Sequence, residues 1–238
     1  MAADQSPKEM KSGNYPVVLP IMVFLWSCIL PALVLAMPVL LPNGSKDYLA
    51  NHLYLIGTIG QLLIDLPAVF LFFRMMKIEK SPIRSSHRIS SSLVGFLLAA
   101  LLAAPRFFAT GKLMGGGFMG GVPAFTQSLR LPPPWNILAS ISAVLAYGPG
   151  EAIFVVYLIL ALDKALGNPQ RIFSRGVLVT SILWALPHVF NVFYFGLSAI
   201  PNVLIMFFLG LVMGVLLKGT RSAWGPIIFW TLVNGTSM

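Results

Sequence analysis

Three polar side chains that could take part in a reaction lie deep inside apolar stretches of the sequence. They are the carboxylate of Glu151, the imidazole of His188 and the amide of Asn234. An ionisable group in such a stretch is costly unless it faces a partner or a cavity, so each is a functional candidate. A carboxylate beside an imidazole can hold and deprotonate a water molecule, and an amide can stabilise an oxyanion. The set is therefore suited to catalysis with an activated water.

A purely structural interpretation is the alternative for these residues. Glu151 and His188 could satisfy each other and fix helix packing, with Asn234 as a third hydrogen-bonding partner. Asp65 also lies in an apolar stretch, but it is nearer a helix end and precedes Pro67. We expect a structural or accessory role for Asp65.

The elements that position these side chains follow from composition. Of 238 residues, 57% are hydrophobic and only 10% are charged. Several apolar stretches reach the roughly 20 residues that a helix needs to cross a bilayer. The sequence predicts an all-α polytopic membrane protein with about seven transmembrane helices. The expected spans are Val17–Leu41, Leu53–Phe73, Leu93–Phe108, Asn136–Leu162, Gly176–Gly196, Pro201–Leu217 and Ala223 to the end.

The depth of the three polar residues can be compared along these spans. Counted from the same end of each span, Glu151, His188 and Asn234 lie about 11 or 12 residues inward, which places each roughly 17–18 Å from that boundary. Three side chains from three helices are thus expected to share one plane near the middle of the membrane.

The basic residues indicate the orientation. With the N-terminus in the cytoplasm, 12 of the 16 lysine and arginine residues fall on the cytoplasmic side, as the positive-inside rule requires. Residues 1–16 are then a polar cytoplasmic tail, and no cleavable signal peptide is expected. The net charge of +9 is explained by membrane topology, so we expect membrane lipid and no nucleic acid as partner.

An external loop from about Ala109 to Pro134 is rich in glycine and proline, with GGGFMGG at Gly115–Gly121. No strand leads into it and no helix follows directly, so we interpret it as a flexible or re-entrant loop rather than a phosphate cradle. We expect three parts: the tail over residues 1–16, helices and this loop over residues 17–135, and core helices over residues 136–238.

Three segments in the last part resemble, in order and spacing, the motifs of the CPBP family, which includes CAAX prenyl proteases and bacteriocin-processing or immunity proteins. They are GPGEAIFVVY (Gly148–Tyr157), ILWALPHVF (Ile182–Phe190) and TRSAWGPIIFWTLVNG (Thr220–Gly235). The resemblance covers roughly Asn136–Met238 and implies a CPBP-like core in the C-terminal half.

The resemblance also implies roles for individual residues. Glu151 matches the first glutamate of the first motif, the water-activating base, and Pro149 with Gly150 would open the helix that carries it. His188, four residues after an aromatic residue, matches the second motif. Asn234 matches the asparagine of the third motif, where it would polarise the scissile carbonyl.

Other family positions differ here. The second glutamate of the first motif is Ala152, its arginine is Val156, and the histidine of the third motif is Trp230. The resemblance implies one divalent metal, zinc, held by Glu151 and His188, and no other cofactor. A catalytic zinc usually has three protein ligands, so these two alone would make a poor site.

The leading hypothesis is an intramembrane endopeptidase, or metalloendopeptidase, of the CPBP/CAAX-protease type. Its substrate would be a membrane-associated protein or a prenylated C-terminal peptide. The alternative is a catalytically inactive relative that acts as a membrane protein-binding scaffold or immunity factor. A small transporter with a proton relay ranks third, because the sequence shows no inverted repeat.

Overall fold

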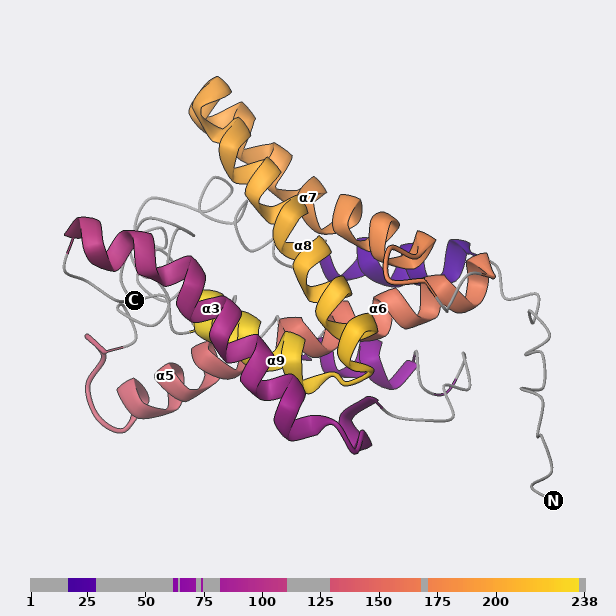
Figure 1. Ribbon diagram of the computed structural model, residues 1–238. Helices are drawn as coiled ribbons and strands as arrows, with labels where there is room; N and C mark the ends of the chain where they lie inside the picture. Colours follow the sequence, from indigo (N-terminus) through magenta and orange to yellow (C-terminus); the bar gives the residue numbers. More distant parts are fainter. Residues whose placement is uncertain are drawn as a thin grey trace, which may run out of the picture.

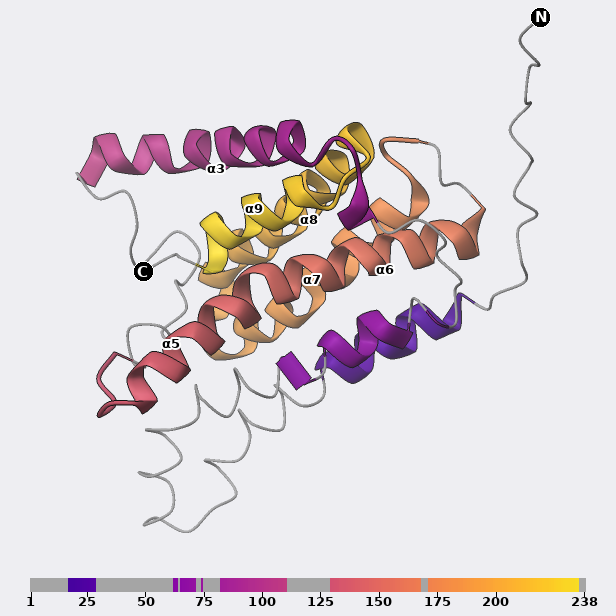
Figure 2. The same cartoon turned by 90° about the horizontal axis from the view of Figure 1, so that it is seen from below.

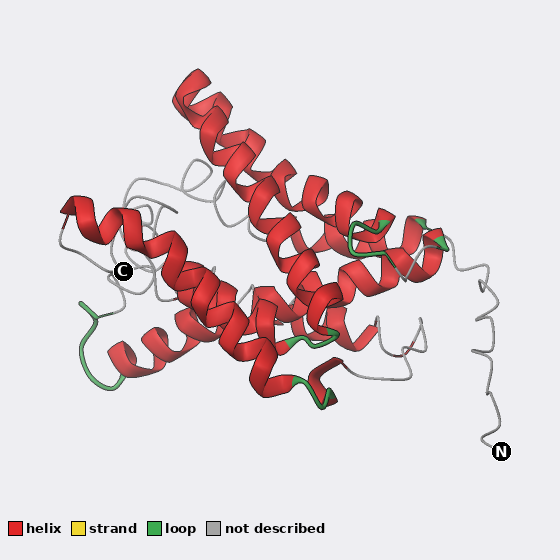
Figure 3. Cartoon of the chain, in the orientation of Figure 1, coloured by secondary structure: helices red, strands yellow, loops and turns green. Residues whose placement is uncertain are grey.

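The computed structural model describes residues 17–28, 62–63, 65–71, 74, 82–110, 129–167 and 171–235. These residues form helices joined by short turns, with no strand among them (Figure 3). The all-α prediction is confirmed. The N-terminal tail, the later part of the first expected span, the earlier part of the second and the Gly115–Gly121 loop lie outside the described residues.

The principal helices match the expected spans in order. After a helix over Val18–Cys28 and helical turns over residues 65–71, the structure has η1 (Pro82–Arg84), α3 (Arg88–Thr110), α5 (Trp135–Leu145), η2 (Ala146–Gly150), α6 (Glu151–Leu166), α7 (Arg175–Phe195), η3 (Gly196–Ala199), α8 (Ile200–Thr220), α9 (Trp224–Trp230) and η4 (Thr231–Gly235). Three of these segments are long and apolar enough to cross a membrane: Arg88–Pro105, Trp135–Leu166 and Gly196–Thr220.

The span with Glu151 is one continuous helical segment, because η2 joins α5 to α6 as a π-helical turn. Pro149 lies inside this turn, so the helix does not begin at Pro149 and Gly150 as expected. A π turn inserts one extra residue and relaxes the i→i−4 pattern, which accommodates a proline that has no N–H. Glu151 therefore lies in the middle of a span.

Helix α6 is the centre of the molecule. Six consecutive side chains, Phe154 to Ile159, are each at most 1% exposed. Figure 2 shows α6 with α8, α9 and then α3 on one side and the helical residues 18–28 and 65–71 on the other. Phe24 stacks on Phe154 with ring centroids 6.4 Å apart, which anchors the first helix to this core.

Helices α7 and α8 form a closely packed hairpin and run side by side (Figure 1). Gly210 and Gly214 lie one turn apart on α8 and allow this approach. A Cβ at Gly210 would lie 3.0 Å from the Ser181 Cα, and one at Gly214 would collide with the Val177 side chain. Small residues at this spacing are typical of helix contacts in membranes.

A buried ion pair joins three helices at one end of the molecule. We call this the basic end, because the starts of α3 and α7 and the ends of α6 and α8 carry lysine and arginine residues there. Asp163 of α6 is 1% exposed and pairs with Lys218 of α8. Its Oδ1 also accepts a hydrogen bond from the Gly176 N–H at the start of α7, at 2.9 Å. The end of α6, the start of α7 and the end of α8 therefore lie together.

The start of α3 joins the same end through Ser91, whose side chain is fully buried. The Ser91 hydroxyl lies 2.8 Å from the Thr220 hydroxyl and accepts from the Gly225 N–H at 2.7 Å. The Trp224 indole N–H donates to the Ile83 carbonyl at 2.9 Å. These bonds fix α3 against the connection between α8 and α9.

We expect Gly95→Ala to lower the free energy of unfolding by about 1–3 kcal/mol. A Cβ at Gly95 would collide with the backbone carbonyl of Gly225 in α9, and backbone cannot move aside as a flexible side chain can. Gly219→Ala is the matched control, because a Cβ there meets nothing within 4 Å. Thermal unfolding of the detergent-solubilised protein measures both. Equal stability of Gly95→Ala and wild type would contradict the close packing of α3 on α9.

The outward faces of these helices are apolar. On α3, Phe96, Leu97 and Leu101 are more than half exposed, and on α8 so are Leu204 and Phe208. Only 17% of the Arg88–Pro105 segment is buried within the protein. Exposed apolar surface of this extent is what a bilayer covers.

Candidate active site

The Glu151 carboxylate is held from two directions by N–H donors. Oε2 accepts from the Trp230 indole at 2.9 Å and from the Asn234 side-chain amide at 3.0 Å. Both bonds end on the same oxygen, so Oε1 remains available for a further donor such as water. Charged acceptors need such donors in a low-dielectric interior, and two of them also fix the orientation of the carboxylate.

Two π-helical turns bring these residues together, η2 before Glu151 and η4 around Asn234. In η2 the Glu151 N–H donates to the Ala146 and Gly148 carbonyls, rather than to the Tyr147 carbonyl that an α-helix would use. The Tyr147 carbonyl instead accepts from the Asn234 side chain at 2.9 Å. The π turn thus frees a backbone acceptor for the asparagine, and such turns are frequent at functional sites.

The two turns also touch directly. A Cβ at Gly148 would lie 3.1 Å from the Thr231 side chain, which is tighter than ordinary contact. The absence of a side chain at position 148 therefore lets η4 approach η2 closely enough for Asn234 to reach Glu151. Asn234 itself is 7% exposed.

Both hydrogens of the Asn234 amide are engaged in this arrangement. One lies toward the Tyr147 carbonyl and the other toward Glu151. An amide that polarises a substrate carbonyl needs an N–H to donate. In the structure the Asn234 amide bonds to Glu151 and to the Tyr147 carbonyl, and its role in polarising a substrate carbonyl stays a prediction.

Trp230 is a member of the site that sequence reasoning missed. The sequence indicated only that an indole can neither ligate a metal nor accept a proton. The structure shows the group that an indole does have, one N–H donor, on the Glu151 carboxylate. One feature of the sequence could have indicated this role. Trp230 and Asn234 are four residues apart, which places their two N–H donors on one face of a helix.

His188 lies on α7, and its Nδ1 is 3.3 Å from the Trp184 carbonyl one turn earlier. Among the described residues no hydrogen bond joins His188 to Glu151 or to Asn234. The connection runs through two indoles, because Trp184 packs edge-to-face on Trp230 with ring centroids 5.8 Å apart. The structural pairing of Glu151 with His188 is therefore not what satisfies Glu151.

The indole N–H of Trp184 is a second donor close to the candidate site. The Trp184 side chain is 9% exposed, and its indole N–H is buried without a hydrogen-bond partner among the described residues. A buried donor left unpaired costs about 1–3 kcal/mol. Such a group beside a candidate site is a donor that a substrate can satisfy.

Asp65 lies at the other side of Glu151. It is 1% exposed and near enough to Glu151 for the two carboxyl groups to interact electrostatically. The accessory role expected for Asp65 stays a prediction.

The described residues do not fit a zinc site. One Glu151 oxygen, Oε2, already accepts two N–H groups. Across the described part of the chain, no group of three His, Cys, Asp or Glu side chains could hold a metal ion. The zinc ion stays a prediction.

Comparison with known families decides what kind of domain carries this site. Residues 132–236 match the family model described as "Type II CAAX prenyl endopeptidase Rce1-like". These residues form an Rce1-like domain. The match confirms the resemblance to the CPBP family that the three motifs indicated. No curated protein and no solved structure matches the chain.

The Rce1-like domain extends from the start of α5 through η4 and contains Glu151, His188 and Asn234. The Rce1-like domain and the long apolar helices together make the chain an integral membrane protein. The roles of the three residues stay predictions, as does the division of the chain at residue 136.

Proposed function

We propose that this chain is an intramembrane endopeptidase that cleaves a membrane-associated protein or a prenylated C-terminal peptide with water activated by Glu151. The Rce1-like family supports this class of reaction. The observation that carries the proposal is the convergence of the Trp230 and Asn234 donors on one oxygen of Glu151. It orients the carboxylate and keeps the other oxygen available.

In the proposed reaction Glu151 Oε1 accepts a proton from water, and the resulting hydroxide attacks the carbonyl carbon of the scissile peptide bond. The carbon–nitrogen bond then breaks, and Glu151 returns the proton to the leaving amine. Trp230 and Asn234 act as positioning residues for the base. His188 would hold the water from the α7 side.

The carbonyl oxygen gains negative charge in this step and needs a donor. Since both Asn234 hydrogens are engaged, we assign this donor role to the unpaired Trp184 indole N–H. A donor already fixed in a buried site stabilises developing charge without reorganisation. The indole of Trp184 would then supply a donor in a domain where Trp230 replaces a histidine.

We expect Trp184→Phe to reduce kcat about 10²-fold with little change in KM, because phenylalanine keeps an aromatic ring on Trp230 but has no N–H donor. Trp135→Phe is the matched control, since Trp135 is 56% exposed at the start of α5. Cleavage of a prenylated CAAX peptide and a panel of membrane peptides by the reconstituted protein gives both constants. Unchanged kcat in Trp184→Phe would remove Trp184 from the reaction.

A non-catalytic binding protein is the second candidate. The observation that favours it is Trp230, since an indole on Glu151 blocks one oxygen and cannot exchange protons as a histidine can. Such a relative would bind a membrane-embedded protein segment as a scaffold or immunity factor. Captured partners that persist in Glu151→Gln, together with no cleavage by wild type, would support this function over the endopeptidase.

We also propose that the basic end faces the cytoplasm, with the N-terminus on that side. Arg84, Arg88, Lys164, Arg175 and Arg221 all lie near the contacts that join the starts of α3 and α7 to the ends of α6 and α8. Arg130 lies just before α5, at the opposite end of the Trp135–Leu166 span. This asymmetry supports a positive-inside orientation.

A further inference from the structure

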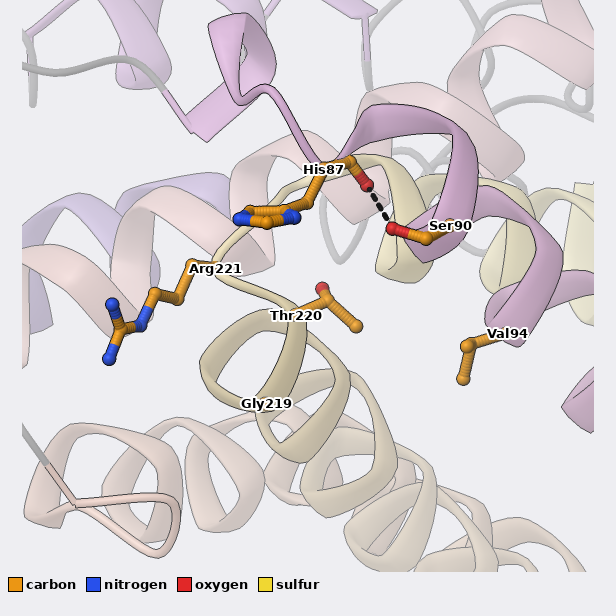
Figure 4. A pocket seen from close by; sticks show the side chains of 6 residues that line it. All are labelled: His87, Ser90, Val94, Gly219, Thr220 and Arg221. Atoms are coloured by element: carbon orange, nitrogen blue, oxygen red, sulfur yellow. Dashed lines mark hydrogen bonds between the residues drawn. The ribbon is translucent and has the colours of Figure 1, made fainter.

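A pocket of about 420 Å³ lies at the basic end, away from Glu151. It is lined by His87, Ser90 and Val94 beside α3 and by Gly219, Thr220 and Arg221 at the end of α8. In Figure 4 the His87 ring and the Arg221 guanidinium lie on one side, and Ser90 and Val94 line the α3 side.

The polar lining of this pocket carries the charge of Arg221, and no acidic side chain of the described residues lines it. Arg221 forms no ion pair with any described residue, and the acidic Asp163 nearby is already paired with Lys218. The Ser90 hydroxyl donates to the His87 carbonyl at 3.1 Å, so the donors that remain for a ligand belong to Arg221 and His87. The pocket therefore favours an anion.

The frame around the pocket is rigid. Thr220, in its floor, bonds to the Leu216 carbonyl at 2.6 Å and to Ser91 at 2.8 Å, so its hydroxyl is held in place. Arg221 adopts a left-handed conformation with φ 51° at the end of α8, which is uncommon for a residue other than glycine. Arg221 is thus the left-handed residue that ends α8 beside the pocket.

The position of the pocket indicates which kind of anion it could bind. The apolar segments Arg88–Pro105 and Gly196–Thr220 both end here, so the pocket lies at the level of lipid headgroups. Val94 lies one turn deeper than Ser90 on α3 and is followed by the exposed apolar face of that helix. A ligand that fits has an anionic group at the interface and hydrocarbon alongside α3.

We propose that this pocket binds the phosphate group of an anionic membrane lipid, with Arg221 and His87 as donors and the acyl chains along α3. Basic pockets between transmembrane helices on the cytoplasmic side are suited to such headgroups. The proposal does not depend on proteolysis, because none of the pocket residues belongs to the site around Glu151.

Native mass spectrometry of the full-length protein, with phosphatidylglycerol or phosphatidylcholine added in detergent, tests the proposal. Wild type should bind phosphatidylglycerol preferentially. Arg221→Gln should weaken this binding about fivefold, the effect of one basic residue near an anionic surface. Gly219→Trp should abolish it by filling the pocket, since a Cβ at Gly219 meets nothing within 4 Å. Arg171→Gln, which removes an exposed arginine outside the pocket, should leave it unchanged.

Two results would overturn the proposal. Equal weakening by Arg221→Gln and Arg171→Gln would show diffuse attraction to a basic surface instead of a site. Displacement of phosphatidylglycerol by equimolar inorganic phosphate would show that the pocket recognises free phosphate and not a lipid. Thermal unfolding of each variant without added lipid verifies that Gly219→Trp remains folded.

Discussion

Replacing Glu151 with glutamine is expected to reduce peptide cleavage by at least about 10²–10⁴-fold, the usual contribution of a positioned general base. Glutamine has nearly the same shape, and its carbonyl oxygen can still accept from the Trp230 indole that now bonds to Oε2. It cannot take a proton from water. Turnover of a prenylated CAAX peptide by the reconstituted variant, relative to wild type, measures the loss.

Stability provides the control for this variant. Because the Trp230 bond is preserved and no carboxylate has to be buried, Glu151→Gln should unfold at or above the temperature of wild type. A folded variant without turnover assigns the loss to chemistry. A folded variant with full turnover would exclude Glu151 as the base.

The largest effect on stability is expected from Asp163→Ala, which should lower the free energy of unfolding by about 3–5 kcal/mol. The change removes the carboxylate that pairs with the Lys218 ammonium, which is 10% exposed, and it removes the acceptor of the Gly176 N–H at the start of α7. Three helices lose their common contact. Chemical or thermal unfolding in detergent measures the difference.

A double variant separates the charge from the packing. Asp163→Asn with Lys218→Met removes both charges and keeps an oxygen for the Gly176 N–H, so it should recover most of the lost stability. If the double variant were as unstable as Asp163→Ala, the unpaired charge would not be the cause. The explanation would then lie in the shape of the Asp163 side chain.

The sequence predicted the helices well, because they follow from local patterns. Apolar runs bounded by charged or turn residues located α3, α5 with α6, α7 and α8. Counting residues inward placed Glu151 and Asn234 at one depth, and the structure brings them into contact. These inferences require only the rise of a helix and the thickness of a bilayer.

The π turns could not be predicted in the same way. Pro149 resembles a helix start, since its missing N–H suits that position as well as it suits a π turn. What distinguishes the two is the contact of η2 with η4, residues about 80 positions apart in the chain. The hydrogen bond from the Asn234 amide to the Tyr147 carbonyl depends on that tertiary contact.

The burial of Asp163 also could not be predicted from local sequence patterns. From sequence it is an acidic residue at a helix end, which ordinarily lies in water. The structure buries it against Lys218 and Gly176, which come from two other helices. Trp230 is different, because its N–H donor could have been foreseen from chemistry once its spacing from Asn234 was noted.

The central claim, hydrolysis by water activated at Glu151, is tested most directly by cleavage in water labelled with heavy oxygen. Wild-type protein in vesicles and Glu151→Gln are incubated with the same prenylated CAAX peptide, and mass spectrometry examines the new carboxyl terminus. The account predicts labelled product from wild type and essentially none from Glu151→Gln. Equal labelled product from both proteins, or none from either with CAAX and membrane peptides alike, would contradict it.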